Sequence, residues 1–167
     1  MNLIVAVDKG FGIGKDNGLL ARIPADMEYF KEKTMGKTIV MGSSTYMSFP
    51  KRPLPNRENL VLTSKPENYP EVKCFTSTGE LFEFIRGRDD DVFVCGGSTV
   101  YLQLLPYCEK AYVTHIDETF DADAFFPNLS ELDNWEKTEE SEVVESNGYR
   151  ITFAVYKNND VKSVQDI

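Results

Sequence analysis

The sequence predicts an α/β fold, in which helices cover a mostly parallel sheet that ends in one or two antiparallel strands. Three observations lead to this prediction. Short apolar runs such as "NLIVAV" and "KTIVMG" are typical of strands that are covered on both faces. Early in the chain these runs alternate with helical patterns. Near the C-terminus, Asn147–Gly148 lies between two strand patterns and predicts a hairpin.

The N-terminal half is predicted to hold four strands and one long helix. Apolar and β-branched runs predict the strands, in the order Asn2–Val7, Lys37–Gly42, Asn59–Thr63 and Glu71–Ser77. After the first strand comes a glycine-rich loop, "DKGFGIGKDNG". A helix is then expected over Ile23–Thr34, because Pro24 suits a first turn and Ile23, Met27 and Phe30 form an apolar stripe.

The C-terminal half continues this alternation and then changes to antiparallel strands. The patterns, in order, are a helix in "TGELFEFIRG", a buried strand in "DDDVFVCGG", a helix in "STVYLQLLPYC" that Pro106 ends, and a strand in "KAYVTHI". The strand patterns "WEKTEESEVV" and "YRITFAVYK" then flank the turn. We expect one domain over residues 1–157 and a polar tail, 158–167, that frays.

Composition and charge limit the possible functions. The chain has 167 residues, is 41% hydrophobic and has no apolar run of the ~18 residues that a membrane span needs. A net charge of −9 argues against nucleic acid as a partner. Three cysteines without a CxxC pair and one histidine, His115, favour a reduced cytoplasmic protein and argue against a metal site. The oligomeric state is not encoded in any pattern, and a monomer is the default expectation.

Asp26 is the first candidate for chemistry, because it lies beside the apolar stripe of the helix over Ile23–Thr34. One interpretation is structural, since a carboxylate in a first turn meets the positive end of the helix dipole. The other interpretation is functional: the side chain faces a ligand in a cleft. The segment by itself leaves both open.

Several strand ends carry residues that suit a phosphorylated ligand. Ligands of open α/β sheets bind beyond the carboxyl ends of the strands. Gly96–Gly97, "VMGSST" and "LTSK" all stand at such ends, which suggests a dinucleotide. The alternatives are a tight turn for Gly96–Gly97 and a helix cap for Ser43. The glycine spacing excludes the standard dinucleotide fingerprint. Arg57, after the rigid "PLPN" turn, could hold a carboxylate or be a solvated surface arginine.

Taken in order, these pieces resemble the dihydrofolate reductase family. The resemblance covers Leu3 to Lys157 and rests on "GIGKDNG", "IPADMEYFK", "VMGSST", "RPLPNRENLVLTS", "VFVCGGSTVYLQLLP", "AYVTHID" and "FFPNL". It implies a three-layer sandwich with an eight-stranded, mostly parallel sheet and a C-terminal antiparallel strand. It also implies an oxidoreductase of folate and one-carbon metabolism, which transfers a hydride from NADPH to C6 of dihydrofolate to give tetrahydrofolate.

The resemblance also implies roles for individual residues. Asp26 would hydrogen-bond the pterin, Thr114 would support it, and Arg57 would hold the α-carboxylate of the glutamate tail. The other implied substrate-binding residues are Ile4, Val5, Met27, Phe30, Phe49, Leu54, Cys95 and Tyr101. The implied cofactor-binding residues are Ala6, Ile13, Gly14, Asn17, Gly18, Leu19, Gly42, Ser43, Ser44, Thr45, Leu62, Thr63, Ser64, Lys65, Cys95, Gly96, Gly97, Ser98, Thr99, Val100 and Tyr101. A cis peptide would join Gly96 to Gly97, and the loop Lys9–Leu19 would be a mobile lid.

Two departures from the family pattern keep alternatives open. Leu20-Ala21 stands where the family usually has Pro-Trp, and Ser43-Ser44 where it usually has an arginine and often a second basic residue. Lys65 is the candidate replacement cation, so we expect a narrower preference for NADPH over NADH. One alternative is another substrate, as in the pyrimidine reductases of riboflavin synthesis. A second is a non-catalytic dinucleotide-binding relative. The alternative of another substrate is opposed by Asp26 and Arg57. The alternative of a non-catalytic relative is opposed by Asp26, Thr114 and Gly96–Gly97.

Overall fold

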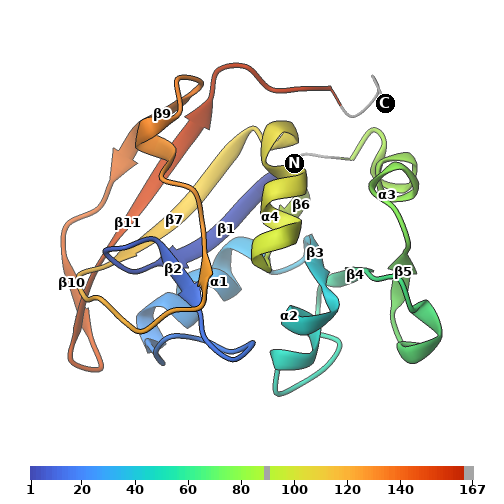
Figure 1. Ribbon diagram of the computed structural model, residues 1–167, viewed down its shortest axis with the longest axis horizontal. Helices are drawn as coiled ribbons and strands as arrows, with labels where there is room; N and C mark the ends of the chain where they lie inside the picture. The colour runs from blue at the N-terminus through green and yellow to red at the C-terminus, as the bar shows by residue number, and fades with distance from the viewer. Residues whose placement is uncertain (89–90, 164–167) are drawn as a thin grey trace.

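One large sheet forms the centre of the molecule (Figure 1), in a computed structural model that describes residues 1–88 and 91–163. Its strands are β1 (Asn2–Val7), β3 (Thr38–Gly42), β4 (Glu58–Leu62), β5 (Lys73–Phe75), β6 (Val92–Val94), β7 (Lys110–Ile116), β9 (Trp135–Glu140), β10 (Val144–Ser146) and β11 (Tyr149–Asn158). They lie in the order β10-β11-β7-β1-β6-β3-β4-β5, and β9 also pairs with β11. The pairs from β7 to β5 are parallel. Those of β11 are antiparallel.

The edge strand beside β11 is split into two pieces. β10 pairs with Tyr149–Ile151, and β9 pairs with Ala154–Asn158 further along the same edge. Between them Ser141 still contacts the sheet, because its backbone N–H donates to the Phe153 carbonyl at 2.8 Å. Because β9 and β10 share one edge position, the nine described strands make a sheet that is eight strands wide. The expectation of an eight-stranded, mostly parallel sheet with a C-terminal antiparallel strand is confirmed, although "WEKTEESEVV" is not one continuous strand.

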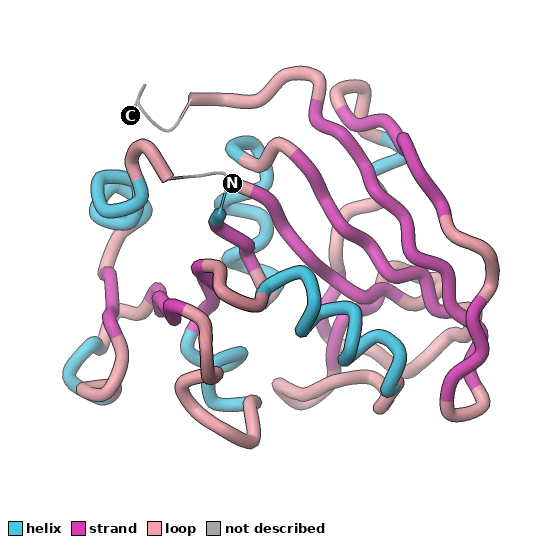
Figure 2. The backbone as a smooth tube through the Cα atoms, turned by 180° about the vertical axis from the view of Figure 1, so that it is seen from behind, coloured by secondary structure: helices cyan, strands magenta, loops and turns pink. Residues whose placement is uncertain are grey.

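Helices cover the sheet on both faces, as the opposite views in Figures 1 and 2 show for α1 (Pro24–Thr34) and α4 (Ser98–Leu104). Pro24 occupies the first turn of α1, and Ile23 is its N-cap, so the helix starts one residue later than predicted. Two further helices are α2 (Ser43–Ser48) and α3 (Thr78–Ile85). Leu81, Phe82 and Ile85 of α3 are buried, as its sequence pattern predicts.

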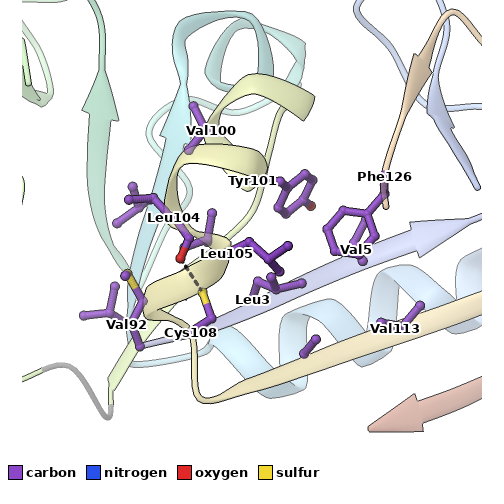
Figure 3. Close-up of a cluster of buried hydrophobic side chains, with 14 of the residues drawn as sticks. Leu3, Val5, Val92, Val100, Tyr101, Leu104, Leu105, Cys108, Val113 and Phe126 are labelled. Atoms are coloured by element: carbon purple, nitrogen blue, oxygen red, sulfur yellow. Dashed lines mark hydrogen bonds between the residues drawn. The ribbon is translucent and has the colours of Figure 1, made fainter. Parts of the chain in front are cut away.

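The two faces of the sheet have separate hydrophobic clusters, because successive side chains of a strand point to opposite sides. Leu3 and Val5 of β1 belong to the cluster under α4, where Tyr101 and Phe126 also lie (Figure 3). Ile4, between them in sequence, belongs instead to the cluster that includes Phe30 of α1. This alternation decides which strand residues can reach a site on the α1 face.

Two segments that were expected to be irregular are ordered by pairing. Within the Lys9–Leu19 loop, β2 (Gly12–Gly14) pairs with β8 (Ala124–Phe125) in a separate two-stranded sheet. At the C-terminus, Asn158 ends β11 with only 2% of its surface exposed, and its Nδ2 donates to the Cys108 carbonyl at 3.0 Å.

The expectation that the whole tail frays is therefore wrong at its start. The Lys162 N–H also donates to the Pro106 carbonyl at 2.9 Å. Residues 164–167 of the expected tail lie outside the described part of the chain. Among the described residues, no helix is long and apolar enough to cross a membrane.

Candidate active site

A carboxylate and a hydroxyl meet between α1 and the sheet. Asp26 stands in the first turn of α1, and Thr114 stands on β7, where it pairs with Ala6 of β1. The Thr114 hydroxyl donates to Asp26 Oδ1 at 2.6 Å. Thr114 is 1% exposed, whereas Asp26 is half-buried. The structure thus brings together the two residues that the sequence placed 88 positions apart.

Burial raises the pKa of Asp26 above its ordinary value of 3.8, and the Thr114 hydrogen bond only partly opposes this effect. No cation compensates the carboxylate, since none of the ion pairs between described residues includes Asp26. A buried carboxylate without a protein cation is strongly stabilised by a ligand that donates hydrogen bonds to it. This favours the functional interpretation of Asp26 over the structural one.

The α1 stripe that was expected to be buried is partly open. Ile23 is 3% exposed, but Met27 is 41% exposed and Phe30 is half-buried. Phe30 belongs to the same hydrophobic cluster as several predicted substrate-binding residues, namely Ile4, Phe49, Leu54 and Cys95. These apolar side chains form one cluster that includes Phe30 of α1, and Thr34 is the buried residue of that helix.

Val5 and Tyr101, also predicted to bind substrate, have their side chains in the cluster on the α4 face. Tyr101 reaches toward the other face through its hydroxyl, which donates to the Ile4 carbonyl at 2.6 Å. The side chain of Val5 therefore lies on the opposite face of the sheet from that of Ile4. Substrate binding by Val5 and Tyr101 stays a prediction.

Arg57 is held at the end of α1, not splayed into solvent. Its Nε donates to the Pro55 carbonyl at 3.0 Å, and its Nη1 donates to the Thr34 hydroxyl at 3.2 Å. Partial burial lowers the pKa of the guanidinium. No ion pair between described residues includes Arg57, so its remaining N–H groups suit a ligand carboxylate.

The strand ends predicted to hold a dinucleotide come together at β3 and β6, which are neighbours in the sheet. The Gly42 N–H donates to the Gly96 carbonyl at 2.9 Å, and this hydrogen bond joins the end of β3 to the segment that follows β6. The peptide between Gly96 and Gly97 is cis. Directly after these glycines α2 and α4 begin, and no side chain caps either helix. Gly42, not Ser43, is the N-cap of α2, so a capping role for Ser43 is wrong.

A side chain at Gly96 or Gly42 would meet neighbouring protein atoms. Gly96 has φ +127, and a Cβ there would lie 3.1 Å from Thr45 Oγ1 and 3.5 Å from the Tyr101 ring. A Cβ on Gly42 would lie 3.2 Å from Val100. The backbone at these strand ends is therefore packed closely against protein side chains, which favours glycine at both positions.

The residues predicted to bind the cofactor at these strand ends are mostly uncharged. Ser43, Ser44 and Ser64 offer hydroxyls, and Leu62 and Thr63 end or follow β4. Lys65 is exposed, and among the described residues it forms no ion pair. Ser98 and Thr99 are the first residues of α4. The arrangement can bind a phosphate mainly through N–H and O–H groups.

The Lys9–Leu19 loop is attached to a distant acidic segment, Asp121–Asp123. The Lys15 ammonium lies 2.9 Å from Asp121 Oδ2, and the Asp16 N–H donates to Asp123 Oδ2 at 3.0 Å. Beyond this attachment Leu19 is 73% exposed. The repeated acids of "DADAFFP" were the available signal for such a contact.

A carboxylate without a cation partner among the described residues, together with glycine strand ends that lead into helix starts, is the arrangement expected of an α/β enzyme that binds a dinucleotide. The sequence model of the dihydrofolate reductase family matches residues 1–158. The chain is 36% identical to dihydrofolate reductase of Bacillus subtilis over 167 residues, which is 98% of each chain. The chain therefore belongs to the dihydrofolate reductase family.

Two further comparisons agree with this assignment. Dihydrofolate reductase of Staphylococcus haemolyticus is 37% identical over 160 residues, which is 94% of this chain and 95% of that one. The solved structure of dihydrofolate reductase from Enterococcus faecalis, complexed with NADP(H) and RAB-propyl, matches with a TM-score of 0.83 and 38% identity, and covers 95% of this chain and 96% of that one. The expected enzyme class, reaction and NADPH cofactor are confirmed at the level of the family.

Proposed function

We propose that this chain reduces dihydrofolate with NADPH at the cleft between α1 and the ends of β3 and β6, and that Asp26 is its principal catalytic residue. The observation that carries the proposal is the Asp26 carboxylate, which is half-buried, held by Thr114 at 2.6 Å and free of protein cations in the described part of the chain. A pterin ring presents neighbouring N–H donors, which match the two oxygens of one carboxylate.

In this proposal the substrate is held at both of its ends. Asp26 accepts hydrogen bonds from the pterin, and Thr114 fixes the orientation of the carboxylate. Arg57 binds the α-carboxylate of the glutamate tail, and the cluster that includes Ile4, Phe30 and Phe49 packs against the rings between them. Holding both ends fixes the position of C6, which contributes to the rate by reducing the entropy lost in the reaction.

The other side of the cleft holds the cofactor. NADPH supplies the hydride when it is bound. The uncapped first turns of α2 and α4 donate N–H groups to its phosphates, and Ser43, Ser44, Ser64 and Lys65 contact its adenosine end. The Lys9–Leu19 loop excludes water from the nicotinamide side. The proton for the substrate nitrogen comes from water.

We further propose that the protein is a cytoplasmic monomer. Its three cysteines are all free thiols, which suits a reducing compartment. Cys108 is buried, and burial raises its pKa to about 12, so it is a packing residue. Size-exclusion chromatography with light scattering tests the oligomeric state, and a stable dimer would contradict this part of the proposal.

The test of the proposed activity is the loss of reduced-nicotinamide absorbance when dihydrofolate is added to the purified protein. NADPH and NADH are compared in parallel. We expect oxidation that depends on dihydrofolate and is faster with NADPH. Folded protein that binds NADPH but does not oxidise it with dihydrofolate would overturn the proposal and favour another substrate.

A further inference from the structure

Asp8 is a buried carboxylate outside the substrate cleft that the proposed mechanism does not use. It follows the last residue of β1 and is 3% exposed. Its Oδ1 accepts hydrogen bonds from the N–H groups of Gly10 at 2.9 Å and Gly12 at 2.7 Å. Its Oδ2 accepts one from the N–H of Phe120 at 3.0 Å. One side chain thus joins the base of the Lys9–Leu19 loop to a segment 112 residues away.

The backbone around Asp8 closes the same junction. The Asp8 N–H donates to the Gly12 carbonyl at 3.0 Å, and its carbonyl accepts from the Phe11 N–H at 3.0 Å. The Lys9 N–H donates to the Glu118 carbonyl at 2.9 Å. Each of these bonds fixes either the turn over residues 8–12 or its contact with the segment before β8.

Gly12 is packed so closely at this junction that a side chain there would collide with its neighbours. A Cβ on Gly12 would lie 2.4 Å from Ala122 Cβ and 2.9 Å from Asp8 Oδ2. Gly12 is the first residue of β2, so its position sets where the β2 strand and the exposed residues that follow it begin. The hydrogen bonds that join Asp8 to Gly12 and Phe120, which we call the clamp, therefore fix the position of the first residues of the loop.

The three donors require a carboxylate. An ionised carboxylate only accepts hydrogen bonds and offers two oxygens, whereas an asparagine of the same shape has one oxygen and one NH₂ donor. Asparagine could therefore serve the two glycine N–H groups or the Phe120 N–H, but not both. In either orientation its NH₂ group would face another N–H donor.

We propose that Asp8 is a positioning residue that holds the Lys9–Leu19 loop in the conformation that closes over the cofactor. The inference rests on the proposed function, because it assigns the loop to the nicotinamide side. Asp8 contacts neither ligand, so it acts through Gly12 and β2. Its loss affects cofactor binding and hydride transfer, while the Asp26 side of the cleft is unchanged.

The test compares Asp8→Asn with the charge-matched control Asp133→Asn, whose side chain is exposed. For Asp8→Asn we expect at least tenfold faster amide exchange at Gly10, Gly12 or Phe120. The NADPH Kd should rise about fivefold, and single-turnover hydride transfer should slow about tenfold. Dihydrofolate binding should change by less than twofold. The control should match the wild type throughout.

Two results would overturn the inference. One is a lower melting temperature for Asp8→Asn with an unchanged NADPH Kd and an unchanged hydride-transfer rate, which would make Asp8 merely structural. The other is an equal loss of affinity for both ligands. If wild-type protein shows no turnover, the proposed function fails, but amide exchange and NADPH binding still decide the role of Asp8.

A second variant keeps the test decisive if Asp8→Asn does not fold. Gly12→Ala retains Asp8, but its added methyl group would collide with Ala122 and with the Asp8 carboxylate. The hydrogen bonds between Asp8 and the loop should therefore be displaced. It should reproduce the slower hydride transfer and the weaker NADPH binding. Normal kinetics in a folded Gly12→Ala protein would contradict the inference.

Discussion

The two sides of the cleft are built from different parts of the chain. In the proposed function, recognition on the substrate side depends on a few charged side chains: Asp26 with its Thr114 partner at 2.6 Å, and Arg57 at the end of α1. On the cofactor side, it depends on glycines, helix starts and hydroxyls, and Lys65 is an exposed cation. Where binding depends on a few charged side chains, a single substitution should reduce affinity or activity strongly. Where the contacts are spread over the backbone, a single side-chain substitution should reduce them only slightly. The predictions below test this difference, from the largest expected effect to the smallest.

Asp26→Asn should have the largest effect. Asparagine keeps the shape but cannot offer two acceptor oxygens, so we expect kcat/KM for dihydrofolate to fall about 10²- to 10⁴-fold. Steady-state kinetics at saturating NADPH measure this loss. A folded variant with more than a tenth of wild-type activity would mean that the substrate side does not depend on this carboxylate.

The same variant should be more stable than the wild type at neutral pH. The folded-state pKa of Asp26 is raised, so folding favours its protonated form, and its contribution to stability is lost as pH rises through that pKa. Asparagine does not titrate. The melting temperature of Asp26→Asn should therefore exceed that of the wild type at pH 7, and the gap should shrink as pH falls toward 4.

Arg57→Gln should be the next most damaging change. It removes a charge-assisted contact worth about 1.5–3 kcal/mol, so we expect the KM for dihydrofolate to rise roughly 10- to 150-fold while kcat changes little. Exposed Arg86→Gln, which loses only a surface pair with Glu83, is the matched control. If both variants have the same KM, Arg57 is a surface arginine.

Thr114→Val should have an intermediate effect and a distinctive pH profile. The valine keeps the volume but removes the hydrogen bond that lowers the pKa of Asp26, so that pKa rises further. We expect kcat/KM to fall about tenfold at pH 7. The acid limb of its pH profile should move to higher pH. An acid limb at the same pH as in the wild type would mean that Thr114 does not influence the ionisation of Asp26.

Lys65→Ala should have the smallest effect, because an exposed charge contributes about 0.2–1 kcal/mol. We expect the ratio of kcat/KM for NADPH to that for NADH to fall by no more than about fivefold. Ser43→Arg should raise the same ratio. A loss of more than fiftyfold in Lys65→Ala would show that one cation dominates the cofactor side, as Asp26 dominates the substrate side.

The sequence predicted the features that depend on local patterns. The apolar runs located β1, β3 and β7, Pro24 located the start of α1, and Leu81, Phe82 and Ile85 marked the buried side of α3. The ordered motifs identified the family, and with it the pairing of Asp26 with Thr114 and the cis peptide at Gly96–Gly97.

The features that were missed depend on contacts between distant segments. β2 has only three residues and pairs with a two-residue strand more than a hundred positions away, so no local periodicity reveals it. The three hydrogen bonds of Asp8 and the break between β9 and β10 are likewise fixed by their partners. The roles of the individual site residues stay predictions.

The most direct test of the contrast between the two sides is the separate binding of dihydrofolate and NADPH to Asp26→Asn, each measured by titration calorimetry against the wild type. Our account predicts that the Kd for dihydrofolate rises at least tenfold while the Kd for NADPH stays within twofold. Equal weakening of both ligands, or unchanged dihydrofolate binding, would contradict it.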